Sequence, residues 1–537
     1  MNCKFIMFAS CGLFVAHPLV AATLTVTSLA DSGPGSLRNQ VAASLAGDTI
    51  QFAVHGTIVL SSFIDINHTL FVQGPGPAAL VVDANLADRA FTTAGNPVVL
   101  SGMTIQRGLV IGTSGTDAVY CENGGAGGDA NGGAIRDTGS SIILSNCWFR
   151  GNLAHGGPGG RGGDDFVGIC YHPGNGGSGG SAAGGAFYST TSIATVINCT
   201  FSDNHAIGGQ GGRGGNSTTS YTAGGTGGQG GGADAGAVRD TPPGTVLEAF
   251  VNCTFSGNSS LGGNGGNGGN NVSNAGGPGG NGGAATAGAI SCIQGKWLAC
   301  TIVSNSAVAG VGGSGGSGSP PGASGGSGLE LAGGVAGYAI PGAPCICDIA
   351  NTILAENHAG TFPNYSIAFN DLGFNYVGTF DYPGYCAFSF PSRIGGVASP
   401  LHPLLGPLAQ NGGGLPTHAP LPGSPVIDWG NKFGLSTDER GAPRPFGSPA
   451  VSGGDGSDIG AFEFGSTALA IHVEDGKSKM TITWPASYGD FTLQFTWDLL
   501  VANSWQDVTN PPAVAGSQFV FTNAPSSANR FFRLIHH

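Results

Sequence analysis

The chain has 537 residues, of which 101 are glycine and only 9% are charged. The formal net charge is −13 and no basic stripe is present, so the composition excludes nucleic acid as a partner. The hydrophobic fraction of 40% is ordinary, which excludes a charge-rich disordered chain and indicates that apolar side chains are buried.

The N-terminal residues 1–22 have the pattern of a secretory signal peptide. An apolar run extends from Phe5 to Ala16, and Val20-Ala21-Ala22 forms a small-residue cleavage site before Thr23. Cys11 weakly matches a lipoprotein cleavage site, but the apolar run before it is too short for that alternative. No later apolar run is long enough to span a membrane, so the mature chain is predicted to have no transmembrane span.

Residues 23–110 are predicted to form a cap and the first coils of the fold. A turn that begins at Asp31 leads into a short amphipathic helix from Gln40 to Leu45, and a strand follows from Asp48 to Phe52. A cap is expected because a stack of strands would otherwise end in an open apolar core with unpaired edges.

A repeated motif organises the middle of the chain. The letters N-C-W-F-R-G-N begin at Asn146, N-C-T-F-S-D-N at Asn198 and N-C-T-F-S-G-N at Asn252, and weaker copies begin at Ala299 and Asn351. The step between copies is about 47 to 54 residues. Each copy contains alternating Ile, Val, Thr and Phe residues, which predict short strands with no helical period.

A strand-turn-strand unit that recurs in this way predicts an all-β fold, a parallel β-helix (solenoid) over residues 111–360 in which each coil stacks on the last. Residues at equivalent positions then form columns. The predicted columns are an asparagine ladder of Asn152, Asn204, Asn258, Asn305 and Asn357, and an interior column of Cys147, Cys199, Cys253 and Cys300.

The column cysteines are expected to be buried thiols that pack as small hydrophobic groups, with disulfides between coils as the alternative. One cysteine per coil does not make a zinc site, because zinc ligands converge within one loop. Cys121 and Cys170 lie in successive glycine-rich inserts and are the better disulfide candidates. Further disulfides of undetermined connectivity could come from Cys292, Cys345, Cys347 and Cys386.

Glycine-rich inserts interrupt the repeats, beginning at Gly156, Gly208, Gly262 and Gly310, and most of them follow a G-G-x period of three. A polyproline-II-type helix has three residues per turn, so each x lies on one edge and two glycine faces are bare. Bare faces allow neighbouring tracts to form lateral backbone hydrogen bonds, whereas flexible linkers are the alternative. The strict triplet favours the ordered arrangement.

One calcium-type nonapeptide spans residues 159–167 and includes Asp164 and Asp165. A calcium site of this type needs tandem copies, because ligands from adjacent turns share each ion. Neither residue is therefore assigned as a ligand, and no metal or cofactor is predicted.

The only recurrent charged pair of the repeats is Arg136-Asp137, which returns as Arg239-Asp240, with Tyr188 at the corresponding position of the copy between them. These five residues are predicted to form a surface stripe that contacts a glycan. The alternative is that they are solvated side chains on the outside of the coils. Carboxylates do not cluster elsewhere, so no catalytic residue is assigned.

The C-terminal part is predicted to contain two further units. Residues 361–465 hold the last coils and a distinct module, and residues 466–537 form a small β-sandwich of alternating strands with Pro and Asn turns. Trp484, Trp497 and Trp505 of this sandwich are expected in its core, with a sugar-binding platform as the alternative.

Several motifs resemble known families. The letters L-A-D-S-G-P-G-S-L-R, G-D-T-I-Q-F, L-F-V-Q-G-P-G-P and L-S-G-M-T-I-Q-R-G resemble secreted bacterial right-handed β-helix proteins of the polymorphic outer membrane protein and pectin-lyase-like type. The block from Leu404, with T-D-E-R-G-A-P-R and D-I-G-A-F-E, resembles the C-terminal module of choice-of-anchor Q proteins. The resemblance covers roughly residues 23–465, implies a right-handed solenoid and carries over no catalytic residues.

The sequence thus predicts a secreted or cell-surface, non-enzymatic protein, adhesin-like or polysaccharide-contacting and in an outer-membrane setting if it stays attached to the cell. Its expected partners are extracellular polysaccharides or cell-envelope components. The alternative is a polysaccharide lyase or glycoside hydrolase that acts on acidic glycans.

Overall fold

The structure is a computed structural model that describes residues 21–139, 141–165, 170, 172–190, 193–241, 248–292, 294–337, 347–380, 388–446, 453–465, 470–473, 480–485, 491–497, 505–515, 518–523 and 530–536. Residues 1–20 of the predicted signal peptide, and Cys345 and Cys386, lie outside these ranges. No helix in the described ranges is both long enough and apolar enough to cross a bilayer.

The described chain is almost entirely β, with one helix, α1 (Leu37–Ala43), and four parallel sheets that form its main body. The largest sheet has 18 strands: β1 (Thr23–Val26), β2 (Asp48–Phe52), β3 (Gly56–Val59), β5 (Leu70–Gln73), β6 (Leu80–Asp83), β8 (Val98–Gln106), β12 (Ser141–Arg150), β16 (Ile193–Ile197), β17 (Thr200–Ser202), β21 (Glu248–Val251), β22 (Thr254–Ser256), β26 (Gly295–Leu298), β27 (Thr301–Val303), β31 (Cys347–Ala350), β32 (Ile353–Ala355), β34 (Phe369–Gly373), β35 (Tyr376–Val377) and β36 (Arg393–Ile394).

The other three parallel sheets contain shorter strands. An eight-stranded sheet holds β4 (Ile64–Ile66), β7 (Phe91–Ala94), β11 (Ile135–Thr138), β15 (Phe187–Thr190), β20 (Val238–Thr241), β25 (Ile290–Ser291), β30 (Val335–Ala336) and β33 (Tyr365–Ser366). One five-stranded sheet holds β9 (Leu109–Ile111), β13 (Leu153–His155), β18 (His205–Ile207), β23 (Ser259–Leu261) and β28 (Ser306–Val308), and a second holds β10 (Ala130–Asn131), β14 (Ala182–Ala183), β19 (Ala233–Asp234), β24 (Ala285–Ala287) and β29 (Glu330–Ala332).

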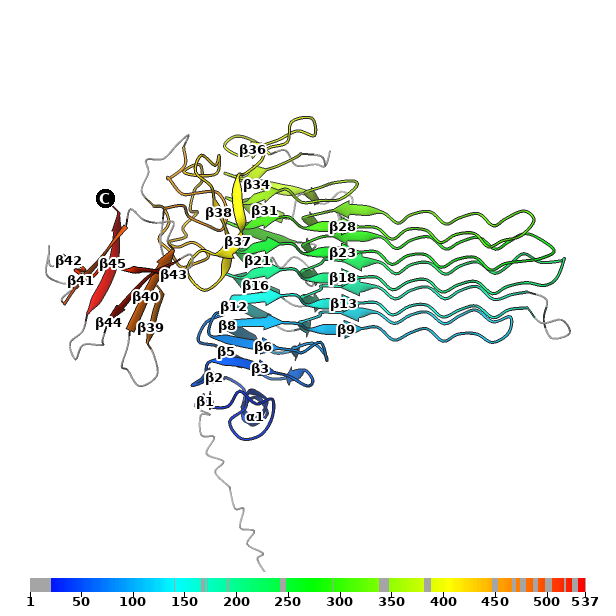
Figure 1. Cartoon of the computed structure of the whole chain (residues 1–537), viewed down its shortest axis with the longest axis horizontal. Coiled ribbons are helices and arrows are strands. Elements are labelled where there is room, and N and C mark those ends of the chain that lie inside the picture. Colours follow the sequence, from blue (N-terminus) through cyan, green and yellow to red (C-terminus); the bar gives the residue numbers. More distant parts are fainter. Residues whose placement is uncertain are drawn as a thin grey trace, which may run out of the picture.

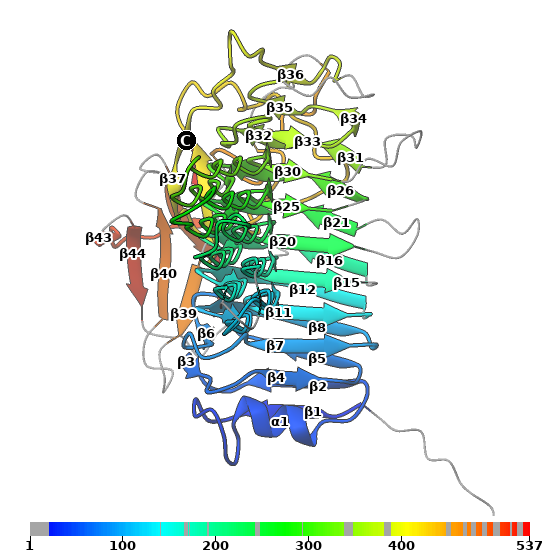
Figure 2. The same ribbon diagram turned by 90° about the vertical axis from the view of Figure 1, so that its right-hand side faces the viewer.

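Strands from successive repeats pair in parallel and keep the register of the repeated motif. Trp148 of β12 lies beside Thr200 of β17, and Thr200 lies beside Thr254 of β22. The eight-stranded sheet and both five-stranded sheets follow the order of the repeats along the chain. Figures 1 and 2 show the resulting layers stacked one above another, with α1 at one end of the stack.

The hydrophobic core runs the length of the stack as one apolar cluster, from Val26 in β1 to Val377 in β35. Within it, the rings of Phe149 and Phe201 stack with centroids 4.6 Å apart, and those of Phe201 and Phe255 with centroids 4.8 Å apart. Neighbouring strands of a sheet lie about 4.8 Å apart, so each ring belongs to one layer of the stack.

The repeated asparagines form a buried ladder that joins the layers. The side-chain Nδ2 of Asn152 donates to Oδ1 of Asn204 over 2.9 Å, and Asn204 makes the same bond to Asn258 over 2.9 Å. The ladder continues from Asn258 to Asn305 over 2.8 Å and from Asn305 to Asn357 over 2.9 Å. Buried amide groups are thereby paired from layer to layer.

The repeated cysteines form a second buried column. Cys147, Cys199, Cys253 and Cys300 are all fully buried and none of the four forms a disulfide. Burial raises the pKa values of Cys199 and Cys253 well above the ordinary value, so these thiols stay protonated. They therefore pack as small neutral groups. Cys292 and Cys347 are also buried.

The N-terminal helix differs from its prediction. It spans Leu37–Ala43, whereas the sequence pattern placed it from Gln40 to Leu45. Ser36 is the cause, because its side chain accepts a hydrogen bond from the N–H of Asn39 and so starts the helix three residues earlier.

The described residues of the segment 404–465, which are 404–446 and 453–465, fold over the outer face of the 18-stranded sheet. The hydroxyl of Thr200 donates to the carbonyl of Pro416 over 2.9 Å, and the N–H of Ala461 donates to the hydroxyl of Thr301 over 3.0 Å. An antiparallel pair of strands lies in this segment, β37 (Leu405–Gln410) and β38 (Pro416–Pro420). Threonines on the outside of the stack are thereby covered instead of solvated.

Two small antiparallel sheets follow. One contains β39 (Ala470–Val473), β40 (Met480–Pro485), β43 (Ala513–Ala515) and β44 (Gln518–Asn523), and the other contains β41 (Phe491–Thr496), β42 (Gln506–Asp507) and β45 (Phe531–His536). Trp484 of β40 and Leu493 of β41 belong to one apolar cluster. The prediction that Trp497 lies in the core is wrong: it follows the last residue of β41 and is 47% exposed.

Candidate functional site

The five residues of the predicted glycan stripe point in two directions. Arg136, Tyr188 and Arg239 pair side by side across β11, β15 and β20. Arg136 is exposed and the other two are partly buried. Arg239 forms an ion pair with Asp234.

The two aspartates of that stripe are fully buried. Asp137 accepts hydrogen bonds from the hydroxyl of Thr93 over 2.5 Å and from that of Ser189 over 3.2 Å, and Asp240 occupies the same column. Successive side chains of a strand point to opposite faces. Because each aspartate follows an outward-facing arginine, neither carboxylate is accessible to an external ligand.

The charged residues of the two C-terminal motifs form a buried network. Arg440 Nη2 lies 2.7 Å from Asp438 Oδ2, Arg444 Nε lies 3.0 Å from Glu463 Oε2, and all four side chains are at most 1% exposed. Burial, together with the neighbouring Glu463, raises the pKa of Asp458 well above its ordinary value. These groups hold the segment 404–465 together and are not accessible to a substrate.

The glycine-rich inserts form a separate structure beside the sheets, which we call the arm. It consists of five outgoing tracts, 112–120, 156–165, 208–217, 262–271 and 310–318, and five returning tracts, 123–129, 174–181, 224–232, 276–284 and 322–329. We number its layers 1 to 5 in chain order. Figure 1 shows the tracts extending side by side away from the stacked sheets.

The first glycine of each triplet joins one layer of the arm to the next. The N–H of Gly159 donates to the carbonyl of Gln210 over 2.8 Å, and the N–H of Gly211 donates to the carbonyl of Asn264 over 2.8 Å. The pattern continues along the outgoing and the returning tracts. It satisfies backbone groups that a three-residue helix cannot pair internally.

The second glycine joins outgoing tracts to returning tracts. The N–H of Gly160 donates over 2.8 Å to the carbonyl of Gly125, in the returning tract of layer 1. The carbonyl of Gly160 accepts from the N–H of Gly177, in the returning tract of layer 2, also over 2.8 Å. The two rows of the arm are therefore bonded to each other as well as within themselves.

The residue at position x completes the pattern with its side chain. Oδ1 of Asn267 accepts the N–H of Ser314 over 3.0 Å, and Oδ1 of Asn216 accepts the N–H of Asn270 over 3.0 Å. All three N–H groups of a triplet can thus be paired. The inserts accordingly have lateral hydrogen bonds, the arrangement that the triplet period favoured.

The close approach of neighbouring backbones requires glycine at most positions one and two of these triplets. A Cβ on Gly212 would lie 1.9 Å from the carbonyl oxygen of Gly160, and one on Gly265 would lie 2.0 Å from that of Gly280. No glycine of the described tracts has a positive φ, so the left-handed conformation is not the reason. At these two positions the backbones approach too closely for any side chain.

Layers 1 and 5 of the arm each have a neighbouring layer on one side only. On the other side they carry side chains at the positions that hold glycine in the inner layers. Position two of the outgoing triplets faces the preceding layer, and in layer 1 it holds Thr113 and Thr116. Position one of the returning triplets faces the following layer, and in layer 5 it holds Ser324 and Ser327. Side chains at these positions obstruct a further layer and protect the open edges.

The tip of the arm consists of the turns 117–123, 217–223, 271–275 and 318–321 and the described residues of 164–173. A disulfide joins Cys121 to Cys170, the pair that the sequence favoured, and so connects layers 1 and 2. Asp164, which belongs to the calcium-type nonapeptide of residues 159–167, forms an ion pair with Arg161 over 2.6 Å. Among the described residues, no group of three or more His, Cys, Asp or Glu side chains could hold a metal ion.

Asp165 organises the turn of the next layer. Its carboxylate accepts the hydroxyl of Ser217 over 2.6 Å, the N–H of Thr218 over 2.9 Å and the N–H of Thr219 over 3.3 Å. Burial of Asp165 opposes its charge, but these hydrogen bonds outweigh burial and lower its pKa below the ordinary value. The carboxylate is therefore ionised and fixes the start of the turn.

Asn271 fixes the other side of the same turn from layer 4. Its Nδ2 donates to the carbonyls of Thr219 and Thr222, and its Oδ1 accepts the N–H of Ser273 over 2.7 Å. Tyr221 lies between those two threonines and is 85% exposed. The turn therefore holds an aromatic ring in solvent on a hydrogen-bonded support.

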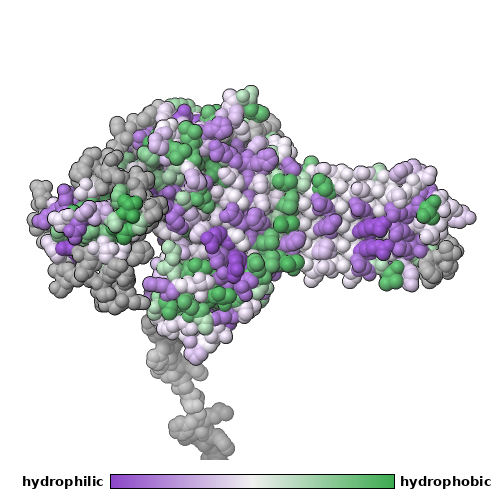
Figure 3. All heavy atoms as spheres, in the orientation of Figure 1, coloured by the Kyte–Doolittle hydropathy of each residue, from purple (hydrophilic) through white to green (hydrophobic). Residues whose placement is uncertain are grey.

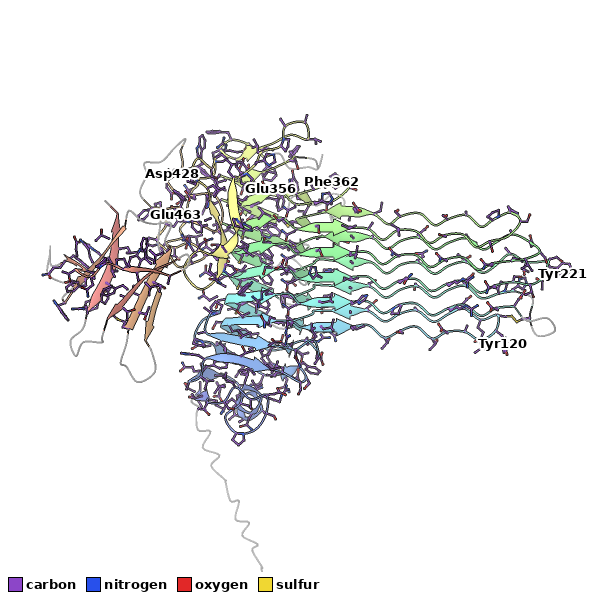
Figure 4. All side chains as sticks on the ribbon, in the orientation of Figure 1. Tyr120, Tyr221, Glu356, Phe362, Asp428 and Glu463 are labelled. Carbon is purple, nitrogen blue, oxygen red and sulfur yellow. A yellow bond between two sulfur atoms is a disulfide. The ribbon has the colours of Figure 1, made fainter. Side chains whose placement is uncertain are left out.

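Exposed apolar side chains gather at this end of the arm. Val119, Tyr120 and Val272 are 71%, 48% and 85% exposed, in addition to Tyr221. Figure 4 shows Tyr221 at the far end of the arm and Tyr120 on the lower side of the arm, short of that end, and Figure 3 shows small, separate hydrophobic patches there on an otherwise pale to hydrophilic surface. The tip is the candidate functional site.

A small cavity lies elsewhere, in the two C-terminal sheets. Its volume is about 110 Å³. It is lined by Trp484, Thr492, Leu493, Val508, Asn510, Pro512 and Phe521. None of these side chains is charged, so the cavity offers no acid or base for chemistry.

The tip lies outside the residues that the sequence predicted as a site. The available signal was the loss of the triplet at S-T-T-S-Y-T-A, residues 217–223, where the side chains return between two glycine tracts. Comparison with known proteins gives no further guide, because no family model and no curated protein matches the chain.

Proposed function

We propose that this chain is a secreted or cell-surface, non-enzymatic protein that contacts extracellular polysaccharide or cell-envelope components in an adhesin-like manner. The observation that carries the proposal is the group of exposed apolar side chains at the end of the arm, held there by hydrogen-bonded turns. Exposed apolar groups that gather at one place mark interaction sites. The arm then serves to carry this site away from the body.

The proposal includes a right-handed parallel β-helix of the polymorphic outer membrane protein and pectin-lyase-like type, with a choice-of-anchor Q module in residues 361–465 and a C-terminal β-sandwich. Parallel sheets in the order of the repeats support the solenoid, and parallel strand connections are right-handed in nearly all proteins. The segment 404–465, with its buried ion pairs, supports a distinct module.

Export from the cytoplasm is also part of the proposal. The disulfide between Cys121 and Cys170 supports it, because disulfides persist in oxidising compartments. The pattern of residues 1–22 supplies the route.

A retention experiment tests the contact function. The full-length mature chain is passed through gels that contain individual polysaccharides, and its retardation gives an apparent affinity. We expect Tyr221→Ala to weaken retention at least tenfold, as for an aromatic residue that dominates an interface. Phe390→Ala is the matched control, since Phe390 is 75% exposed on the body. Equal retention of both variants and the native chain would refute a contact at the tip.

The rival function is a polysaccharide lyase or glycoside hydrolase acting on acidic glycans. The observation in its favour is the exposed Arg136 beside Tyr188 on the outer face of the eight-stranded sheet. Release of unsaturated or reducing ends from pectin or alginate, abolished by Arg136→Ala, would establish the rival and overturn the non-enzymatic proposal.

A further inference from the structure

The charged side chains of the tip are mainly acidic. Asp117 and Glu122 are exposed on either side of Tyr120. Arg161 is paired with Asp164, so its charge is already compensated. The surroundings of this aromatic residue are therefore anionic.

Among the described residues of the outgoing tracts that lead to the tip, Arg213 is the guanidinium group whose side-chain hydrogen bond goes to an amide instead of a carboxylate. Arg213 donates from Nη2 to the amide oxygen of Asn216 over 2.8 Å. Over the described part of the tip, carboxylates outnumber guanidinium groups, and none of the glycine-rich tracts contains a lysine. A glycan that carries uronate, sulfate or phosphate would meet like charges there.

The apolar groups of the tip suit a different ligand. The ring of Tyr221 has an apolar face and a hydroxyl that can donate and accept hydrogen bonds. A neutral sugar ring has the complementary arrangement, with C–H groups on its face and hydroxyls at its edge. The turn that carries Tyr221 is already fixed by Asp165 and Asn271, so binding would order little of the protein.

We infer that the tip binds an uncharged polysaccharide and discriminates against acidic ones. The inference rests on the proposed function, since it names the ligand class of the same site. Tyr221, in the turn of layer 3, provides the stacking surface, and Asp117 and Glu122, two layers away in the turn of layer 1, provide the discrimination against acidic chains.

The experiment measures retardation of the full-length chain at low ionic strength in two sets of gels. One set contains the neutral polymers dextran, xyloglucan and galactomannan, and the other contains pectin, alginate and heparin. We expect at least one neutral polymer to retard the native chain, Tyr221→Ala to lose this retardation at least tenfold, and Tyr221→Phe to keep most of it. The double variant Asp117→Asn, Glu122→Gln should gain retardation by acidic polymers.

The outcomes separate the inference from the proposed function. If an acidic polymer binds the native chain and this binding depends on Tyr221, the inference is overturned while the contact function stands. If a neutral polymer binds but Arg136→Ala removes the binding and Tyr221→Ala does not, the site is the stripe on the body and the inference is again overturned. If no polymer of either set is retained, both fail. Phe390→Ala should behave like the native chain throughout.

Discussion

Glu439 is a buried carboxyl group enclosed between two threonine hydroxyls of the 18-stranded sheet. It is 1% exposed and accepts hydrogen bonds from Thr200, over 2.8 Å, and from Thr254. Burial raises its pKa well above the ordinary value of 4.5, against the lowering effect of the two hydrogen bonds. The folded protein therefore keeps a proton that the unfolded chain releases once the pH exceeds about 4.5.

This proton makes stability depend on pH in a definite direction. Because the folded state binds more protons than the unfolded state above pH 4.5, the free energy of unfolding falls as the pH rises toward the pKa of the folded state. We expect Glu439→Gln, which cannot ionise, to lose less stability than the native chain between pH 5 and pH 8. Denaturant unfolding of both proteins at the two pH values measures the difference.

The comparison isolates Glu439 from other buried carboxyl groups. The pKa values of Asp458 and Glu463 are also raised by burial, and both residues are unchanged in the variant, so their contribution cancels. Parallel pH profiles of the two proteins would show that Glu439 is ionised in the folded state.

The sequence could predict the position of some side chains but not of others. The asparagine and cysteine columns could be predicted because the same residue type recurs at the same step, and stacked layers bring such residues together. The orientation of Asp137 was available too, since it follows Arg136 in a strand and must point to the opposite face. Tyr221 was not predictable in this way, because it occurs once and outside any repeat.

At the scale of the element, the arm makes a strong prediction about glycine. A Cβ on Gly212 would lie 1.9 Å from the carbonyl oxygen of Gly160, whereas one on Gly232 would have only the carbonyl oxygen of Ala284 nearby, at 3.7 Å. We therefore expect Gly212→Ala to separate neighbouring tracts and Gly232→Ala to leave them in place. Amide hydrogen exchange of the segment 208–232, measured by mass spectrometry, reports the outcome.

The native arm should exchange slowly in this segment, because its N–H groups are bonded to neighbouring tracts. Gly212→Ala should bring exchange in the outgoing tract close to that of an unstructured peptide, while Gly232→Ala, the matched control in the same layer, should exchange like the native chain. Rapid exchange in the native arm itself would contradict the hydrogen-bonded arrangement.

The triplet period allowed the sequence to predict bare glycine faces and lateral bonds, but not how the tracts are connected. Each insert leaves the body as an outgoing tract, turns, and comes back as a returning tract. An outgoing tract bonds to the returning tracts of two layers. A period of three is the same in both directions of the chain. The direction of each tract could be derived only from the strands that flank its insert, such as β13 before and β14 after the insert of layer 2.

At the scale of the whole molecule, contacts between distant parts of the chain were the least predictable feature. Thr200 and Glu439 are separated by 239 positions, yet their side chains are bonded. The threonines at Thr200, Thr254 and Thr301 recur at the step of the repeats. Nothing local to the repeats indicated that the segment 404–465 would cover them.

The whole molecule also makes a prediction about the length of the arm. The bonding pattern repeats every three residues, so removing one triplet from all ten tracts at once keeps every remaining glycine opposite its partner. We expect this shortened chain to fold, to keep its tip and to retain its polysaccharide binding. Its arm should be about 9 Å shorter, three residues at about 3.1 Å each, which small-angle scattering detects as a smaller maximum dimension.

Removal of one triplet from a single tract is the contrasting variant. Deleting residues 211–213 would shift the rest of that outgoing tract by three positions against the returning tracts beside it, and the turn that carries Tyr221 would no longer reach Asp165 or Asn271. This variant should lose binding while the stacked sheets melt at nearly the native temperature, because the deleted residues lie outside the main core cluster. If the coordinated deletion were as damaging as the single one, the layers of the arm would not be held by a common three-residue register.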